Sequence, residues 1–204
     1  MDPKGRDREL GLLLERAAEG NEEAWRELVE TYTRRVFGLL VRQCGDRDLA
    51  EEITQATFVQ VVRHIGRYRE QGKFEPWLFR IAINRLRDEM RQRKRRARSM
   101  DMSGGRSADG APWAAAEDQL ADGTGGRSAA PSPLERVTRA EDIQRLRQAI
   151  GQLNEADQEV LHLRHTAGLS FAQIAQTLGQ PLGTVLARGH RAVAKLRKAL
   201  ETDV

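Results

Sequence analysis

The segment Leu169-Ser-Phe-Ala-Gln-Ile-Ala-Gln-Thr-Leu-Gly179, followed by Gln-Pro-Leu-Gly-Thr-Val185, decides the fold of the C-terminal part of the chain. Ser170 and Gln173 have the spacing of a capping box, which predicts a helix that begins at Phe171. Apolar residues then recur at positions i, i+3, i+4 and i+7, the spacing of one buried helix face. They are Phe171, Ile174, Ala175 and Leu178.

A tight turn and a second, basic helix are expected next. Gly179-Gln-Pro181 predicts the turn, because glycine adopts the left-handed conformation and proline cannot continue a helical ladder. The second helix should begin near Leu182, with its apolar side formed by Val185, Gly189, Val193, Leu196 and Leu200. Its outer side should carry Thr184, Arg188, Arg191, Lys195 and Lys198. Two short helices with a basic second helix can read a DNA major groove, although an ordinary helix pair with a solvated face fits the same pattern.

Basic residues gather in two separate blocks. Residues 63–98 hold 13 basic and 4 acidic residues, and residues 182–200 hold 5 basic residues and no acidic one. The formal net charge of the 204-residue chain is only +4. Two basic blocks on a balanced chain favour a polyanion that is contacted in two places.

The N-terminal part is predicted to be helical throughout. One expected stripe contains Trp25, Leu28, Val29, Tyr32, Val36, Leu39 and Leu40, behind Asn21 as an N-cap. A second helix should begin near Asp48, paired with Glu51, and a third near Pro76. The buried side of the third should be Leu78, Ile81, Ala82, Leu86 and Met90. The residues in and around this third helix alternate aromatic rings with cations, a pattern typical of proteins that bind single-stranded nucleic acid.

The chain divides into two all-α domains, residues 1–98 and 134–204, with a linker at 99–133. The linker holds six Gly and three Pro, and its five acidic and two basic residues give a net charge of −3. Such a composition buries too little apolar area to offset its ordering entropy, so we expect it to be flexible. Trp113 is its one large aromatic residue and a possible docking point. The C-terminal domain begins with a stripe of Ile143, Leu146, Ile150 and Leu153.

Composition excludes several classes of protein. No apolar stretch approaches the length of a membrane span and the N-terminus lacks a signal-peptide core, so we expect a cytoplasmic protein without membrane insertion. One cysteine, Cys44, excludes a disulfide framework. The four histidines are scattered, so no metal, cofactor or catalytic residue is expected.

Two motif sets resemble those of bacterial sigma factors. Asp48-Leu-Ala-Glu-Glu-Ile-Thr-Gln-Ala-Thr-Phe58 and Phe74-Glu-Pro-Trp-Leu-Phe-Arg-Ile-Ala-Ile-Asn84, with Asp88, are similar to the second conserved region of that family. The segment that begins at Leu169 is similar to the fourth region. The compact two-domain layout resembles the extracytoplasmic-function (ECF) group. The resemblance therefore implies a promoter-specificity subunit of RNA polymerase.

The resemblance also implies where partners bind. Core polymerase should contact this chain through its β′ clamp helices and β flap, with the clamp helices on Asp48, Glu51, Glu52, Gln55 and Phe58. The melted −10 element should lie on Tyr68, Phe74, Trp77, Arg80, Asn84, Arg87 and Arg91. The −35 duplex should contact Ser170, Thr184, Arg188, His190, Arg191 and Lys195. Family members are usually controlled by an anti-sigma factor, so one is expected here.

This chain departs from the family at the second helix of the C-terminal motif. Family members usually have Lys or Arg and then Ser after the Thr-Val pair, whereas this chain has Leu186-Ala187. Losing a cation and a hydroxyl should weaken direct recognition of −35 bases. More of the recognition would then depend on DNA shape and on Thr184, Arg188 and Arg191.

Three other functions account for only part of the sequence pattern. A stand-alone helix-turn-helix repressor or activator leaves the Asp48–Asn84 motifs unexplained and would need a dimer interface. A metal-dependent nuclease would need a compact cluster of His, Asp and Glu, which the sequence does not suggest. A helical scaffold without a DNA role leaves both basic blocks unexplained.

Overall fold

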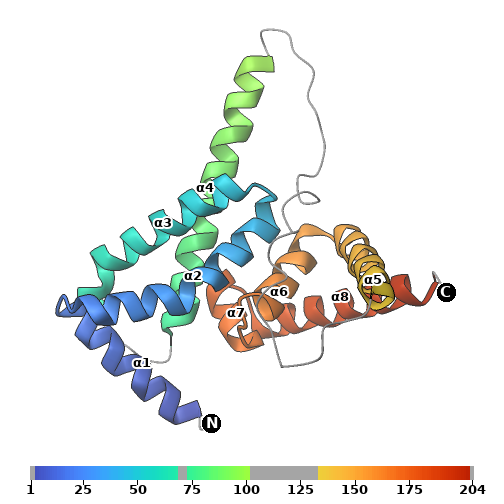
Figure 1. The fold of residues 1–204 in the computed structure, drawn as a ribbon. Helices are drawn as coiled ribbons and strands as arrows, with labels where there is room; N and C mark the ends of the chain where they lie inside the picture. Colours follow the sequence, from blue (N-terminus) through green and yellow to red (C-terminus); the bar gives the residue numbers. More distant parts are fainter. Residues whose placement is uncertain (1–2, 69–72, 102–132, 203–204) are drawn as a thin grey trace.

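The protein is described by a computed structural model that covers residues 3–68, 73–101 and 133–202. Every regular element in these residues is helical, which confirms the all-α prediction. The elements are α1 (Pro3–Ala18), α2 (Glu22–Cys44), α3 (Arg47–His64), the 3₁₀ turn η1 (Ile65–Arg67), α4 (Phe74–Asp101), α5 (Pro133–Gly151), α6 (Glu155–His165), α7 (Phe171–Leu178) and α8 (Leu182–Thr202). Figure 1 shows α1–α4 standing beside α5–α8.

Helix boundaries in the N-terminal half follow local capping chemistry. The Asn21 side chain accepts a hydrogen bond from the Ala24 amide at 2.9 Å, which confirms the predicted N-cap. The next cap is Asp46, whose carboxylate accepts from the Leu49 amide at 3.0 Å. The helix begins at Arg47, next to the predicted start, but the predicted cap at Asp48 was wrong by two residues.

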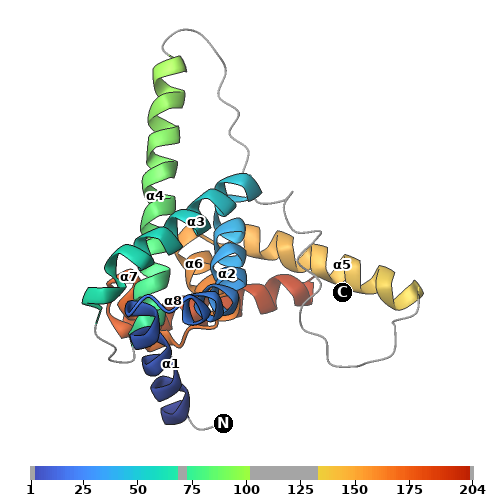
Figure 2. The same cartoon turned by 60° about the vertical axis from the view of Figure 1, so that its left-hand side comes forward.

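The interior of the N-terminal half is a continuous apolar core. Leu28, Tyr32, Val36 and Leu39 are buried along α2 as expected. Two predicted core positions were wrong, because Val29 is 37% exposed and Met90 is 41% exposed. Helix α4 projects past the other helices at its C-terminal end (Figures 1 and 2). Met90 lines an open pocket with Cys44, Asp46 and Leu49, so its side chain is only partly covered.

The C-terminal half contains the expected helix-turn-helix in α7 and α8. Ser170 and Gln173 form both hydrogen bonds of the capping box, and Gly179 ends α7 in the left-handed conformation with φ of 64°. Four predicted core residues, Ile143, Leu146, Val193 and Leu200, are instead 39–47% exposed. Ile143 and Leu146 lie on α5 and Val193 and Leu200 on α8, two helices that contact each other but leave an open groove between them, which Leu200 lines.

The two halves pack directly against each other. Helix α4 lies against α7 and α2 lies against α6, so buried residues of both halves form one cluster. The view in Figure 2 agrees with that in Figure 1 in placing α7 beside the start of α4. In this structure the two halves therefore share one hydrophobic core cluster.

The predicted linker falls mostly outside the described residues, as does Trp113. Helix α4 continues to Asp101, three residues past the expected domain end at 98, and α5 begins at Pro133. Within the described ranges, no helix combines the length and apolar character needed to cross a bilayer.

We predict that Gly189→Ala destabilises the C-terminal half. A Cβ at Gly189 would lie 2.8 Å from Cε1 of Phe171, so the partly buried ring would have to shift. We expect a loss of about 1–3 kcal/mol in the free energy of unfolding, measured by urea denaturation. The matched control is Gly183→Ala on the same helix, where a Cβ meets nothing within 4 Å. Equal stability of the two variants would contradict this packing.

We predict that the protein loses stability as the pH falls from about 6.5 towards 4. His162 on α6 faces Arg42 of α2, and burial first, then Arg42 and His165, lowers its pKa from 6.5 to about 4. The unfolded chain binds a proton near pH 6.5 and the folded chain does not, so acid favours unfolding across this window. Urea denaturation at pH 7, 6 and 5 measures the slope.

His162→Gln should flatten that slope, whereas His190→Gln, at an exposed position on α8, should leave it unchanged. A slope that survives in His162→Gln would contradict the assignment.

Candidate nucleic-acid interface

An aromatic cluster occupies the junction between η1 and the start of α4. The rings of Tyr68 and Trp77 stack with centroids 4.9 Å apart and an interplanar angle of 23°. Phe74 meets Tyr68 edge to face at 5.8 Å and Tyr32 at 5.4 Å. Tyr68 and Trp77 are partly exposed, but Phe74 is only 2% exposed. Phe74 therefore packs against the rings of Tyr68 and Trp77 but is almost fully buried, so it has almost no surface available for contact with DNA.

The predicted −10 residues on α4 share one face of the helix. Trp77, Arg80, Asn84, Arg87 and Arg91 follow each other at steps of 3, 4, 3 and 4 residues, which places them in one stripe. All but Trp77 are exposed. An aromatic platform at one end of a row of cations suits a single strand, because bases stack on rings while cations contact phosphates.

Two of these cations have carboxylate partners. Arg87 Nη2 lies 2.7 Å from Glu159 Oε1 on α6, and Arg91 Nη1 lies 3.4 Å from Asp88 Oδ1 one turn away. Burial raises the pKa of Glu159, and the nearby Arg87 opposes that rise. Arg87 therefore joins the N-terminal half to the C-terminal half.

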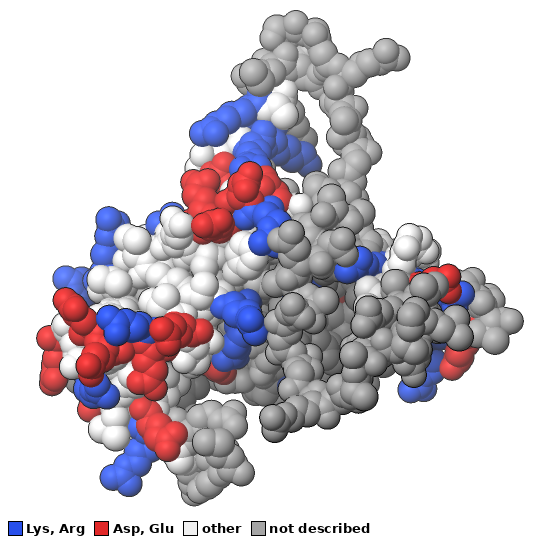
Figure 3. Space-filling model, viewed as in Figure 1, with Lys and Arg blue, Asp and Glu red and all other residues white. Residues whose placement is uncertain are grey.

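The predicted polymerase-binding residues lie together on the outer face of α3. Asp48, Glu51, Glu52 and Gln55 are exposed and Phe58 is partly buried. Figure 3 shows carboxylates gathered where α3 begins and a largely uncharged surface along the rest of the helix. Sequence reasoning missed Val59 and Val62, which are 47% and 54% exposed. They continue the row of Glu52 and Gln55 at helical spacing. That spacing could have indicated from the sequence that both valines lie on the same face.

The predicted −35 residues lie on α8 and at the start of α7. Thr184, His190, Arg191 and Lys195 are exposed, whereas the Ser170 hydroxyl accepts the amide of Gln173 at 3.2 Å as part of the cap. Arg188 is partly buried and donates to the Gln180 side chain at 2.6 Å. Gln180, in the turn between the helices, thus holds Arg188 in place. The sequence did not indicate this role for Gln180.

Asp157 is a further residue that the sequence did not single out. Its side chain is 1% exposed, and Arg191 and Lys195 of α8 each lie 3.6 Å from its carboxylate. The backbone amide of Asp157 donates to Asn154 at 2.8 Å, and the Asn154 amide group donates back at 2.9 Å. The Asn154-x-x-Asp157 spacing was the available signal, since it is that of a reciprocal N-terminal cap.

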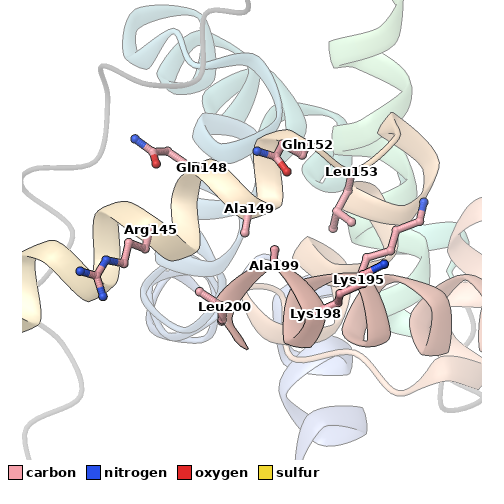
Figure 4. Close-up of a pocket in the computed structure, with 9 residues that line it drawn as sticks. All are labelled: Arg145, Gln148, Ala149, Gln152, Leu153, Lys195, Lys198, Ala199 and Leu200. Atoms are coloured by element: carbon pink, nitrogen blue, oxygen red, sulfur yellow. The ribbon is translucent and has the colours of Figure 1, made fainter. Parts of the chain in front are cut away.

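A basic groove separates α5 from α8. It has a volume of about 430 Å³ and its lining includes Arg145, Lys195 and Lys198. Figure 4 shows Ala149 and Leu153 on one side facing Ala199 and Leu200 on the other. This groove therefore combines apolar side chains with three cations in its lining.

The described residues do not favour a metal site or a reactive cysteine. They contain no group of three or more His, Cys, Asp or Glu side chains placed to hold a metal ion. Cys44 is buried, and that burial raises the pKa of its thiol, which disfavours the reactive thiolate.

Comparison with known proteins identifies both halves. A family model described as Sigma-70 region 2 matches residues 28–96, and one described as Sigma-70, region 4 matches residues 149–198. The RNA polymerase sigma-H factor of Pseudomonas aeruginosa is 33% identical over 189 residues, covering 93% of this chain and 92% of that relative. The ECF RNA polymerase sigma-E factor of Haemophilus influenzae is 30% identical over 181 residues, covering 88% and 89%.

Solved structures share the fold. CnrH, in a complex with the cytosolic domain of CnrY, matches with a TM-score of 0.63 and 23% identity over 95% of this chain and 98% of that one. The sigma factor RpoE of Bartonella quintana, in a complex with the anti-sigma factor NepR, matches with a TM-score of 0.60 and 18% identity, covering 88% and 98%.

Proposed function

The chain belongs to the ECF group of RNA polymerase sigma factors, which direct promoter-specific transcription initiation, and we propose that its two halves read the two promoter elements through the surfaces described above. This family is not a class of enzymes. Two family matches in one chain favour a sigma factor over a stand-alone repressor or activator, which would need only the helix-turn-helix.

The observation that carries the −10 assignment is the single stripe on α4. Trp77 and Tyr68 would stack on unpaired bases, Asn84 would contact a base edge, and Arg80, Arg87 and Arg91 would neutralise phosphates. Strand separation then needs no catalytic group. Pockets for unstacked bases offset the few kcal/mol lost in stacking and pairing, so melting is a binding equilibrium.

The −35 assignment rests on α8. Thr184, in its first turn, would meet the DNA backbone, since the first amides of a helix and a hydroxyl suit phosphate. Arg188, His190, Arg191 and Lys195 would follow the groove, and Ser170 would contact the backbone from the start of α7. Because Ala187 is exposed and carries no hydrogen-bonding group, one position of the reading face contributes little to base discrimination.

Protein partners follow from the remaining surfaces. We propose that the β′ clamp helices of core polymerase dock on α3, where Asp48, Glu51, Glu52 and Gln55 offer charge and Phe58 with Val59 and Val62 offer apolar area. The β flap would contact the C-terminal half. An anti-sigma factor would control the chain in the cytoplasm, as NepR accompanies the similar RpoE.

The direct test is run-off transcription from the host's genomic DNA with purified core RNA polymerase. Adding the protein should produce discrete transcripts. Asn84→Ala should reduce them about fivefold or more, because one base contact is worth about 1–3 kcal/mol, and Trp77→Ala should do the same through lost stacking. Gln144→Ala, an exposed amide on α5, is the matched control and should leave yields unchanged.

The absence of transcripts with wild-type protein, together with salt-sensitive duplex binding by the protein alone, would contradict the proposal and support the repressor.

We predict that promoter strength depends only weakly on single −35 bases. Each substitution in the −35 element should cost less than about tenfold in transcription, since Leu186 and Ala187 cannot donate to base edges. A parallel series in the −10 element of the same promoter is the internal control and should show larger losses. Strong penalties at every −35 base would contradict weakened readout.

A further inference from the structure

Two cations on the outer side of α8 share one buried carboxylate of α6. The side chains of Arg191 and Lys195 are 58% and 53% exposed, whereas that of Asp157 is only 1% exposed. We propose that Asp157 is a positioning residue for −35 recognition, which orients both cations and limits their attraction to DNA of any sequence. The proposal rests on the proposed function, because it concerns the surface assigned to the −35 duplex.

Asp157 is fixed within its own helix. Its Oδ2 accepts from Asn154 Nδ2 at 2.9 Å, and its backbone amide donates to Asn154 Oδ1 at 2.8 Å. Its Oδ1 accepts no hydrogen bond from any residue that the structure describes. A buried carboxylate needs compensating charge, and Arg191 and Lys195 supply it from α8, which packs on α6. The negative charge therefore occupies a fixed point against α8.

The two ion pairs leave both cations able to contact DNA. Arg191 Nη2 lies 3.6 Å from Asp157 Oδ1, and Lys195 Nζ lies 3.6 Å from Asp157 Oδ2. These separations exceed a hydrogen-bond distance, so the carboxylate attracts each cation without holding it by a direct hydrogen bond. A spacing of four residues places both cations on the same face of the helix. Asp157 therefore narrows the directions in which the two side chains point and still leaves more than half of each exposed.

The composition of α8 makes this restraint useful for specificity. Contacts to phosphates attract DNA of any sequence, whereas contacts to base edges distinguish one sequence from another. Leu186 and Ala187 on the proposed reading face carry no side-chain hydrogen-bonding group, so few base contacts are available there. Cations without a nearby carboxylate would then strengthen binding to random DNA more than binding to the −35 element. A fixed negative charge behind Arg191 and Lys195 lowers the sequence-independent attraction, and we expect the specificity ratio to depend on Asp157.

A purely structural role for Asp157 makes a different prediction. Asp157 completes the reciprocal cap of α6 with Asn154. Asparagine has the same shape and keeps a side-chain oxygen that can accept from Asn154, so Asp157→Asn removes the charge and retains the cap. If Asp157 served only as a cap, this variant would bind DNA as the wild type does.

The test measures binding of the full chain to two duplexes by fluorescence anisotropy. One duplex carries the −35 element of a promoter mapped by run-off transcription, and the other has the same base composition in shuffled order. Asp157→Asn should bind the shuffled duplex about fivefold more tightly than wild type, because the two cations lose the charge that offsets them. Its affinity for the −35 duplex should stay within about twofold, since base contacts there depend on oriented cations. The preference for the −35 element should therefore fall.

Glu155→Gln is the matched control for charge. It removes an exposed carboxylate from the same turn of α6, and both affinities should shift by less than about twofold because solvent and salt screen that charge. Asp157→Ser removes the same charge as Asp157→Asn with a smaller side chain, and it replaces that variant if the asparagine protein does not fold.

A stability cycle tests the pairing without DNA. Arg191→Gln/Lys195→Gln leaves the buried carboxylate without its two cations, so the midpoint of urea denaturation should fall. Adding Asp157→Asn to these two substitutions should return the midpoint towards the wild-type value, because no buried charge then remains. A side chain that acts only as a cap would give no such recovery.

Four results would each overturn the proposal: unchanged binding of the shuffled duplex by Asp157→Asn, an equal gain on both duplexes, the same gain with Glu155→Gln, or no recovery of the urea midpoint in the triple variant. Failure of the proposed function has a different signature. The wild-type protein would then give no run-off transcripts with core polymerase, while the gain on shuffled DNA and the stability cycle would remain.

Discussion

The arrangement of this protein depends on one partly buried cation, Arg35. A guanidinium removed from water needs partners, and Arg35 finds them on three segments. It lies over the rings of Tyr32 and Phe79, pairs with Glu75 and donates to the carbonyl of Ala167. The first three belong to the N-terminal half and the last to the C-terminal half. Arg35 thus ties the segment before α7 to α2, and its partner Glu75 accepts from Gln173 of α7, so these two groups join the halves of the protein.

Each half is built so that its outer surface differs from the face that packs inward. On α4 the apolar side enters the core, while the stripe from Trp77 to Arg91 stays at the surface. On α8, Val185 and Ala192 are buried while Thr184 and Arg191 are exposed. Amphipathic helices therefore hold the fold together and present the side chains proposed to contact DNA with the same periodicity.

Local chemistry made much of this predictable from the sequence. The Ser170–Gln173 capping box and the left-handed Gly179 fixed the helix-turn-helix to the residue, because they act within one turn. The errors arose where burial depends on distant packing. Met90 and Val193 lie in apolar stripes, but each is more than 40% exposed. Glu75 and Glu159 gave no signal of their roles, since their partners are remote in sequence and a carboxylate in a helix is ordinarily solvated.

The central claim, that the stripe on α4 and the outer face of α8 read two separate promoter elements, is tested most directly by photocrosslinking to promoter DNA in the complex with core RNA polymerase. A photoreactive residue in place of Trp77 on α4 should crosslink to the −10 segment, and one in place of the exposed Thr184 on α8 should crosslink to the −35 segment. Crosslinks from both positions to the same element, or from neither position, would contradict the account.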